Sequence, residues 1–159
     1  MRAFVLALAL ASCAAPAPVD PMAPLQPLLG CWRGTFEGQP NIYDERCFER
    51  LGAHVVDVHT VQPTTYSGET TYHWDEAQHE IVWAYAASDG GRSNGVMTPE
   101  AGRLLFPPHA YRGADGSEQR LRSVWTIEGE RFSTVSERFE NGAWVALMRI
   151  DYERASESE

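Results

Sequence analysis

The chain has 159 residues, of which 43% are hydrophobic and 22% are charged, and its formal net charge is −9. These values are typical of one globular domain and exclude global disorder. The 13 basic residues are scattered among acidic ones and form no basic stripe. The composition therefore excludes nucleic acid or an anionic membrane surface as the main partner, because such binding needs clustered positive charge.

The amino terminus has the pattern of an export signal. Arg2 precedes an apolar run over residues 3–10, which is too short to span a bilayer and has the length of a secretory signal. The run ends in Leu-Ala-Ser-Cys at residues 10–13, which resembles the processing box of bacterial lipoproteins. Residues 1–12 are therefore predicted to be a lipoprotein signal peptide, and Cys13 the lipidated residue. The alternative is an ordinary signal peptide cleaved near residues 14–17, with Cys13 discarded.

The residues after Cys13 predict a tether and a location. Residues 13–24 are rich in Pro and Ala, as expected for a segment that holds a domain away from a membrane without folding. Ala14, next to the lipidated cysteine, resembles lipoproteins sorted to the outer membrane. We therefore expect the protein on the periplasmic side of that membrane, contacting it through the lipid only. A folded domain is predicted over residues 25–154, followed by a disordered acidic tail over 155–159.

Two further cysteines flank a predicted hairpin. The strands containing "CWRGTFE" and "NIYDERCF" are separated by the turn residues Gly38 and Pro40. If Glu37 faces Asn41, the same register places Cys31 opposite Cys47 and Arg33 opposite Glu45. Directly opposed Cβ atoms lie about 4.5–5.5 Å apart, so this register predicts both a disulfide and an ion pair. The alternatives are two reduced thiols on one strand face or a register slipped by one residue.

The pattern of the remaining residues predicts β-strands separated by turn-forming residues. Segments rich in β-branched and aromatic residues recur at near-regular spacing, and only "PLQPLL" indicates a short helical turn. About ten strands are counted, the last following the Asn-Gly turn at residues 141–142. The expected fold is an all-β, antiparallel up-and-down barrel, because closure removes exposed sheet edges. A β-sandwich is the competing all-β architecture.

The sequence Gly30-Cys31-Trp32 at the first strand resembles the Gly-x-Trp signature of lipocalins and the wider calycin barrels. "LQPLLGCWRG" and the carboxy-terminal "ERFENGAWVALMRIDYER" are similar to uncharacterised bacterial lipocalin-like domains and, more distantly, to nitrobindins. The resemblance implies that Gly30 and Trp32 close one end of the barrel. It also implies that an arginine of the last strand, Arg149 or Arg154, covers the indole through a cation–π contact. Arg46 is a third candidate, because it lies opposite Trp32 in the predicted register.

A barrel of this size can hold one small ligand, so its inward residues are candidate binding residues. On two successive predicted strands, the aromatic residues occupy alternate positions and therefore lie on one face of each strand. Arg46 is added as a charged candidate. The predicted ligand-binding set is Arg46, Tyr66, Tyr72, Trp74, Trp83 and Tyr85. These residues predict either a pocket for a small hydrophobic or amphipathic molecule or a core filled by side chains.

The histidines and acidic residues give no catalytic or metal motif. His54 and His59 have opposite strand parity, His73 is expected to face solvent, and His79 and His109 are expected in turns or loops. The resemblance to nitrobindins raises haem as a cofactor, but no histidine follows His109, so no cofactor, metal or catalytic residue is predicted.

We therefore expect a monomeric binding protein rather than an enzyme. Two alternatives stay open. The first is an enzyme that acts on a small molecule in the barrel cavity, with the candidate residues Arg46, Asp57, Glu69 and Glu137. The second is a filled barrel that binds a partner through an exposed loop around residues 106–116.

Overall fold

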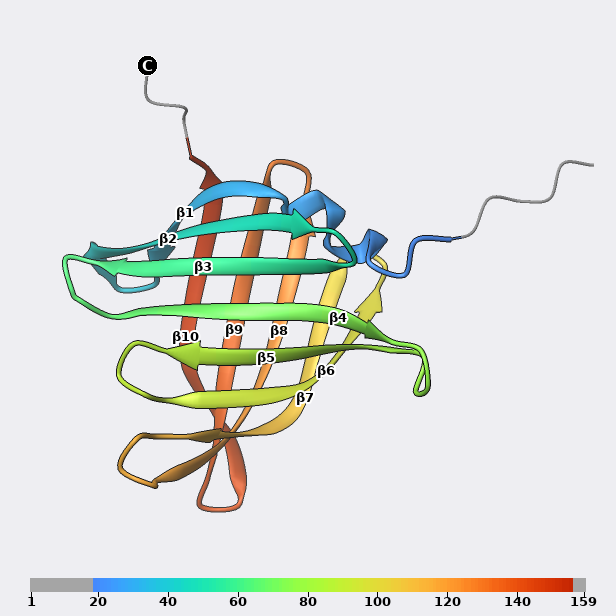
Figure 1. Ribbon diagram of the computed structural model, residues 1–159. Helices are drawn as coiled ribbons and strands as arrows, with labels where there is room; N and C mark the ends of the chain where they lie inside the picture. Colours follow the sequence, from blue (N-terminus) through green and yellow to red (C-terminus); the bar gives the residue numbers. More distant parts are fainter. Residues whose placement is uncertain (1–18, 156–159) are drawn as a thin grey trace, which may run out of the picture.

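The computed structural model describes residues 19–155, which form one all-β barrel (Figure 1). Ten antiparallel strands follow one another around the barrel, and β1 pairs with β10 to close it. The up-and-down barrel predicted from the strand pattern is confirmed, and the sandwich is wrong. The strands are β1 (Gly30–Phe36), β2 (Gln39–Leu51), β3 (His54–Gln62), β4 (Ser67–Asp75), β5 (Glu80–Ala87), β6 (Arg92–Glu100), β7 (Arg103–Arg112), β8 (Glu118–Glu128), β9 (Arg131–Glu140) and β10 (Ala143–Arg154).

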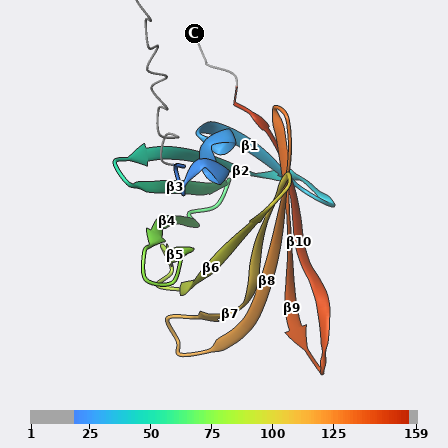
Figure 2. The same ribbon diagram turned by 90° about the vertical axis from the view of Figure 1, so that its right-hand side faces the viewer.

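A short 3-10 helix, η1 (Ala23–Leu28), covers one end of the barrel (Figures 1 and 2). Leu25 and Leu28 are fully buried, and Trp32 packs beside them at 1% exposure. Met22 is also only 1% exposed, and Asp20 forms an ion pair with Arg50. The folded unit therefore begins before residue 25, and the last residues of the predicted tether belong to the core because their apolar side chains fill this end.

Residues 1–18 and 156–159 lie outside the described residues. The predicted signal peptide, the lipidation of Cys13, most of the tether and most of the acidic tail therefore remain predictions. None of the helices that the structure describes is both long and apolar enough to cross a membrane.

The first hairpin has the predicted register over most of its length. Cys31 pairs with Cys47 in the ladder, and the two form a disulfide with a Cα–Cα distance of 4.0 Å. The predicted disulfide is confirmed, and such bonds are typical of exported proteins in oxidising compartments. The register shifts after Thr35, where a tighter turn replaces the predicted one. Within the described residues, Arg33 stacks on the Tyr43 ring at 3.8 Å instead of forming the predicted ion pair with Glu45.

Strand β7 extends into the segment around residues 106–116 that was expected to be an exposed loop. It continues through Pro107 and Pro108, although proline cannot donate to the ladder. The pairing of β7 with β8 shifts register between Phe106 and His109, which accommodates the two prolines. His109 therefore lies on a strand and is partly buried, and its predicted position in a loop is wrong.

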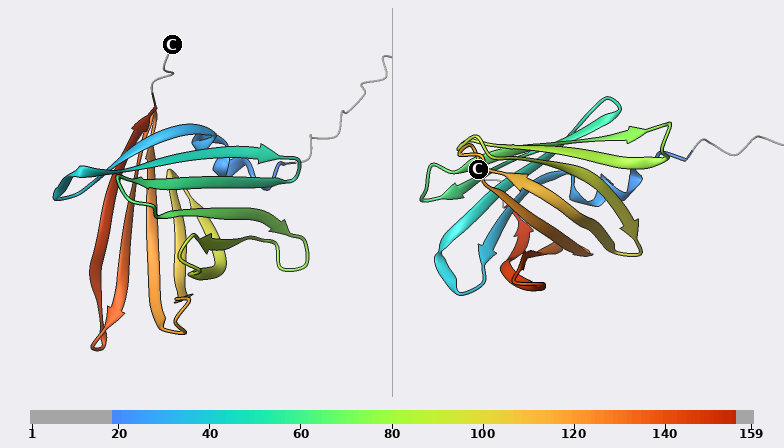
Figure 3. Two further views of the ribbon diagram at one scale, coloured as in Figure 1. Left: turned by 60° about the vertical axis from the view of Figure 1, so that its left-hand side comes forward. Right: turned by 90° about the horizontal axis from the view of Figure 1, so that it is seen from below.

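The five turns that join β1–β2, β3–β4, β5–β6, β7–β8 and β9–β10 lie at the end of the barrel away from η1 (Figure 3). The apolar core is concentrated toward η1, where Trp32, Phe48 and Phe132 pack edge to face. This division leaves the other half of the barrel available for a cavity.

Candidate functional site

The barrel contains a cavity of about 580 Å³. It lies on the side of the barrel away from the η1 core, and 24 residues line it. Small-molecule sites typically occupy about 300–1,000 Å³. The barrel is therefore not filled by side chains, and this finding disfavours the filled-barrel alternative.

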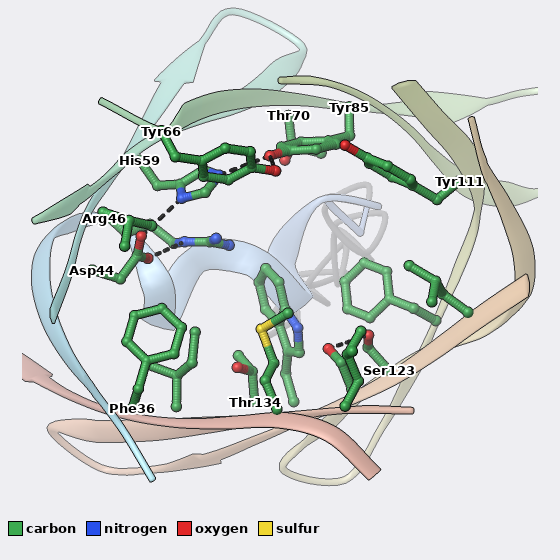
Figure 4. Close-up of a pocket in the computed structure, with 18 of the residues that line it drawn as sticks. Phe36, Asp44, Arg46, His59, Tyr66, Thr70, Tyr85, Tyr111, Ser123 and Thr134 are labelled. Atoms are coloured by element: carbon green, nitrogen blue, oxygen red, sulfur yellow. Dashed lines mark hydrogen bonds and ion pairs between the residues drawn. The ribbon is translucent and has the colours of Figure 1, made fainter. Parts of the chain in front are cut away.

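One wall of the cavity is a hydrogen-bonded chain of polar side chains (Figure 4). The Nδ1 of His59 lies 2.8 Å from Oδ1 of Asp44, and its Nε2 lies 3.1 Å from the hydroxyl of Tyr85. The Tyr85 hydroxyl lies 2.8 Å from that of Tyr66. Asp44 and His59 are 1% and 6% exposed. The chain therefore runs from the buried interior of the barrel toward the β3–β4 turn.

Arg46 extends its guanidinium group into the cavity beside this chain (Figure 4). Its Nε donates a hydrogen bond to Oδ2 of Asp44 at 3.3 Å, and its Nη1 lies 3.6 Å from Oδ1 of Asp57. Tyr152 donates to Asp44 and Tyr72 donates to Asp57. Two buried carboxylates therefore flank one guanidinium, and each carboxylate also accepts a hydrogen bond from a tyrosine hydroxyl at its Oδ2.

The protonation of these groups follows from burial and from their partners. Burial raises the pKa of Asp44, but the hydrogen bond with His59 and the charge of Arg46 outweigh it, so the pKa lies below its usual value. Burial, as the largest cause, raises the pKa of Tyr85 to about 12 and also raises that of Tyr66. The carboxylate is therefore ionised at neutral pH, while the tyrosine hydroxyls keep their protons.

The facing wall is mostly apolar. The apolar residues that line the cavity there are Phe36, Phe106, Leu121, Trp125, Leu147, Met148 and Ile150. The hydroxyl groups of Ser123, Thr134 and Ser136 lie among them. Leu147 and Met148 are 37% and 42% exposed, although both line the cavity. Both point inward because the β9–β10 pairing shifts register between Ala146 and Met148. The cavity thus presents a hydrogen-bonded polar network on one side and mostly hydrocarbon on the other.

Five of the six predicted ligand-binding residues line this cavity: Arg46, Tyr66, Tyr72, Trp83 and Tyr85. Trp74 does not line it. Although Trp74 shares the parity of Tyr72, it lies one pleat closer to the η1 end, where it packs against the core and beside His79. Strand parity identifies the inward face, but it does not indicate how far along the barrel the cavity extends.

The structure distinguishes the three arginines considered for the closed end. Arg154 lies over the Trp32 ring at 4.0 Å and donates hydrogen bonds to the carbonyl oxygens of Pro27 and Leu29. Arg149 pairs with Asp151 on the outer surface, and Arg46 lies in the cavity. Gly30 has φ +104°, and a Cβ there would lie 2.8 Å from Nη1 of Arg154. The glycine of Gly-x-Trp thus provides both the backbone conformation and the space for the covering arginine.

Two central residues of the polar wall were not predicted as site residues. Asp44 and His59 each lie two positions from another inward-facing charged residue, Arg46 and Asp57. That i, i+2 spacing is the signal that could have identified them, because it places both side chains on one face of a strand. His109 also lines the cavity. Glu69 is exposed on the outer face, and Glu137 pairs there with Arg122.

No family model matches the chain, and no curated protein matches it. Among solved structures, the chain is similar to the crystal structure of Rv2717c from M. tuberculosis, with a TM-score of 0.57 and 15% sequence identity. The similarity covers 89% of this chain and 99% of that chain. At this identity the similarity shows the fold alone.

Proposed function

We propose that this protein binds a small amphipathic molecule in the barrel cavity. The observation that carries the proposal is a cavity of about 580 Å³ with a polar wall and a mostly apolar wall. A molecule with a polar head and a hydrocarbon body would satisfy both walls at once, which neither a fully polar nor a fully apolar ligand would do. The barrel fold is compatible with this role.

Binding is tested with a neutral solvatochromic dye such as Nile red, whose fluorescence rises in an apolar environment. Ser123 lines the cavity beside Ser136, and the variant Ser123→Phe is expected to abolish the dye signal by occupying the space. Val124→Phe is the matched control, because the adjacent residue of β8 has the opposite parity. Equal dye binding by both variants, or none by the unmodified protein, would contradict the proposal.

We further propose that the protein is exported and anchored to the membrane by a lipid on Cys13. The Cys31–Cys47 disulfide supports export, and the residues before Cys13 support lipid processing. Native mass spectrometry of protein extracted from membranes tests both the anchor and the ligand. The expected mass includes an acyl-modified cysteine, and Cys13→Ser is expected to remove that increment and release the protein from the membrane fraction. An unmodified wild-type mass would contradict the anchor.

The Asp44–His59 pair favours a second candidate function, which is proton-transfer catalysis in the same cavity. A carboxylate that orients an imidazole next to a tyrosine hydroxyl is an arrangement used in general acid–base catalysis. If the protein is an enzyme, a co-purified ligand incubated with it is expected to change chemically, and His59→Gln is expected to stop that change. Release of an unaltered ligand supports binding alone.

A further inference from the structure

The fixed charges around the cavity do not favour an anionic ligand. Among the described residues that line the cavity, Arg46 is the only arginine or lysine, and His59 and His109 are the two imidazoles. Burial lowers the pKa of His109. Arg46 already lies 3.3 Å from Asp44 and 3.6 Å from Asp57. The two carboxylates outnumber the one guanidinium, so this cluster carries one net negative charge when His59 is neutral and none when it is protonated. In neither state is there an excess positive charge.

Burial strengthens the effect of these fixed charges on a bound ligand. Asp44 and Asp57 are 1% and 0% exposed, and charges in such an environment are poorly screened by solvent and salt. A carboxylate or phosphate placed against Arg46 would approach both aspartates as well. It would also lose its own hydration on entering the cavity. The attraction to Arg46 would therefore be offset by repulsion from two negative charges that are already in contact with it.

The hydrogen-bonding groups that remain favour a neutral head. Within residues 19–155 the Arg46 guanidinium donates one hydrogen bond, from Nε, so its terminal N–H groups can donate to a ligand oxygen. Tyr66 lines the cavity at the outer end of the chain that leads to His59 and can take part in one further hydrogen bond. The site thus offers cationic donors and a hydroxyl group, which suit a carbonyl, amide or hydroxyl.

We infer that the occupant is an uncharged amphipathic molecule whose carbonyl, amide or hydroxyl head lies between Arg46 and Tyr66. Its hydrocarbon body lies along Phe36, Leu121 and Met148, and the cavity discriminates against carboxylates and other anions of the same shape. This inference rests on the proposed function, because it names the ligand class of the same cavity. Figure 4 shows Tyr66 and Phe36 on opposite sides of the cavity, with Arg46 extending into it between them.

Decanamide and decanoate provide the direct test, since the two molecules are isosteric and differ in charge. Both are titrated at neutral pH against the full mature chain loaded with Nile red. We expect decanamide to displace the dye at a concentration about tenfold lower than decanoate requires, equivalent to about 1.4 kcal/mol. Decylammonium is included as the cationic member of the series. Equal displacement by amide and carboxylate, or tightest binding of either charged molecule, would overturn the inference.

Asp57→Asn tests the electrostatic cause. Asp57 does not itself line the cavity, so the substitution removes one negative charge next to Arg46 and keeps an oxygen that can accept from Tyr72. We expect the affinity for decanoate to rise by about tenfold relative to the affinity for decanamide, because any shift of Arg46 acts on both ligands whereas the lost charge acts on decanoate. Glu69→Gln removes the same charge from the outer face of β4 and is expected to change neither value. Equal effects of the two substitutions on decanoate would show that overall charge, not the buried cluster, is responsible.

The outcomes separate this inference from the proposed function. If Nile red does not bind the unmodified protein, the cavity is not a binding site and both proposals fail. If the dye binds and decanoate displaces it as well as decanamide does, the binding function stands and the neutral-ligand inference fails. If Asp57→Asn does not fold, the comparison of the two ligands on the unmodified chain still decides the inference.

Discussion

The Nδ1 of His59 lies 2.8 Å from Oδ1 of Asp44 inside the barrel. Because an ionised carboxylate can only accept, the imidazole donates from Nδ1 and presents Nε2 to the hydroxyl of Tyr85. Asp44 also accepts from Tyr152 and from Arg46. One buried carboxylate thus orients three side chains from three other positions in the barrel, and it determines the geometry of the polar wall.

Replacing Asp44 is therefore expected to destabilise the fold strongly. Asp44→Ala leaves buried donors of His59, Tyr152 and Arg46 without their acceptor. Removing one partner of a buried charged pair typically costs about 3–5 kcal/mol. Urea denaturation followed by tryptophan fluorescence measures the change in the free energy of unfolding. Asp151→Ala is the control, since Asp151 pairs with Arg149 on the outer surface, and it is expected to change stability by less than about 1 kcal/mol.

The same carboxylate predicts how stability depends on pH. The pKa of Asp44 is lower in the folded protein than in the unfolded chain, so the unfolded chain takes up the proton first as the pH falls. The contribution of Asp44 is therefore complete above its unfolded pKa and is lost below about pH 4. Unfolding free energies measured across this range are expected to fall less steeply in Asp44→Asn. Parallel curves for the two proteins would contradict this assignment.

Much of the barrel was predictable, because alternation and turn residues act locally. Segments rich in β-branched and aromatic residues indicated about ten strands, and one hairpin register identified the Cys31–Cys47 disulfide. The site was predictable in part. Parity identified the inward Tyr66 and Tyr85, but it could not show that Asp44, His59 and Tyr85, on three different strands, converge. That convergence depends on the closure and tilt of the barrel, which are properties of the whole sheet.

The disulfide is expected to contribute measurably to stability. It links residues 16 positions apart, and a loop of that length predicts about 3 kcal/mol through restriction of the unfolded chain. The double variant Cys31→Ser/Cys47→Ser is expected to show this loss in chemical denaturation under oxidising conditions. Adding a reductant is expected to lower the free energy of unfolding of the unmodified protein to about that of the variant. The reductant is expected not to change the stability of the variant. Stability independent of both treatments would mean that the bond contributes little.

Arg154 is expected to stabilise the closed end, whereas Arg149 is not. Arg154 lies over Trp32 and donates to two carbonyl oxygens of the η1 region, and its side chain is 36% exposed. We expect Arg154→Ala to cost about 1–2 kcal/mol, from the cation–π contact and the lost hydrogen bonds. Arg149→Ala removes the same charge from the same strand but is expected to cost less than about 1 kcal/mol. Thermal unfolding of both variants measures the difference, and equal losses would contradict the closing role of Arg154.

Gly68 is expected to control the polar wall through Tyr85. Gly68 is buried on β4, and a Cβ at this position would overlap the hydroxyl end of the Tyr85 ring. Gly68→Ala is therefore expected to push Tyr85 away from His59 and Tyr66. The backbone at Gly68 cannot move instead, because such a shift would disturb the pairing of β4 with both β3 and β5. We expect ligand or Nile red affinity to fall by about tenfold or more.

Glu69→Ala is the matched control for Gly68→Ala, since it alters the next residue of the same strand on the exposed face. It is expected to leave dye binding unchanged. Circular dichroism separates loss of binding from loss of the barrel, and the tyrosine titration reports the displaced ring. In the unmodified protein burial raises the pKa of Tyr85 to about 12, so fewer tyrosines ionise near pH 10 than in the unfolded chain. Gly68→Ala is expected to move the pKa of one tyrosine toward its ordinary value. If neither the tyrosine titration nor dye binding changes, Gly68 does not position Tyr85.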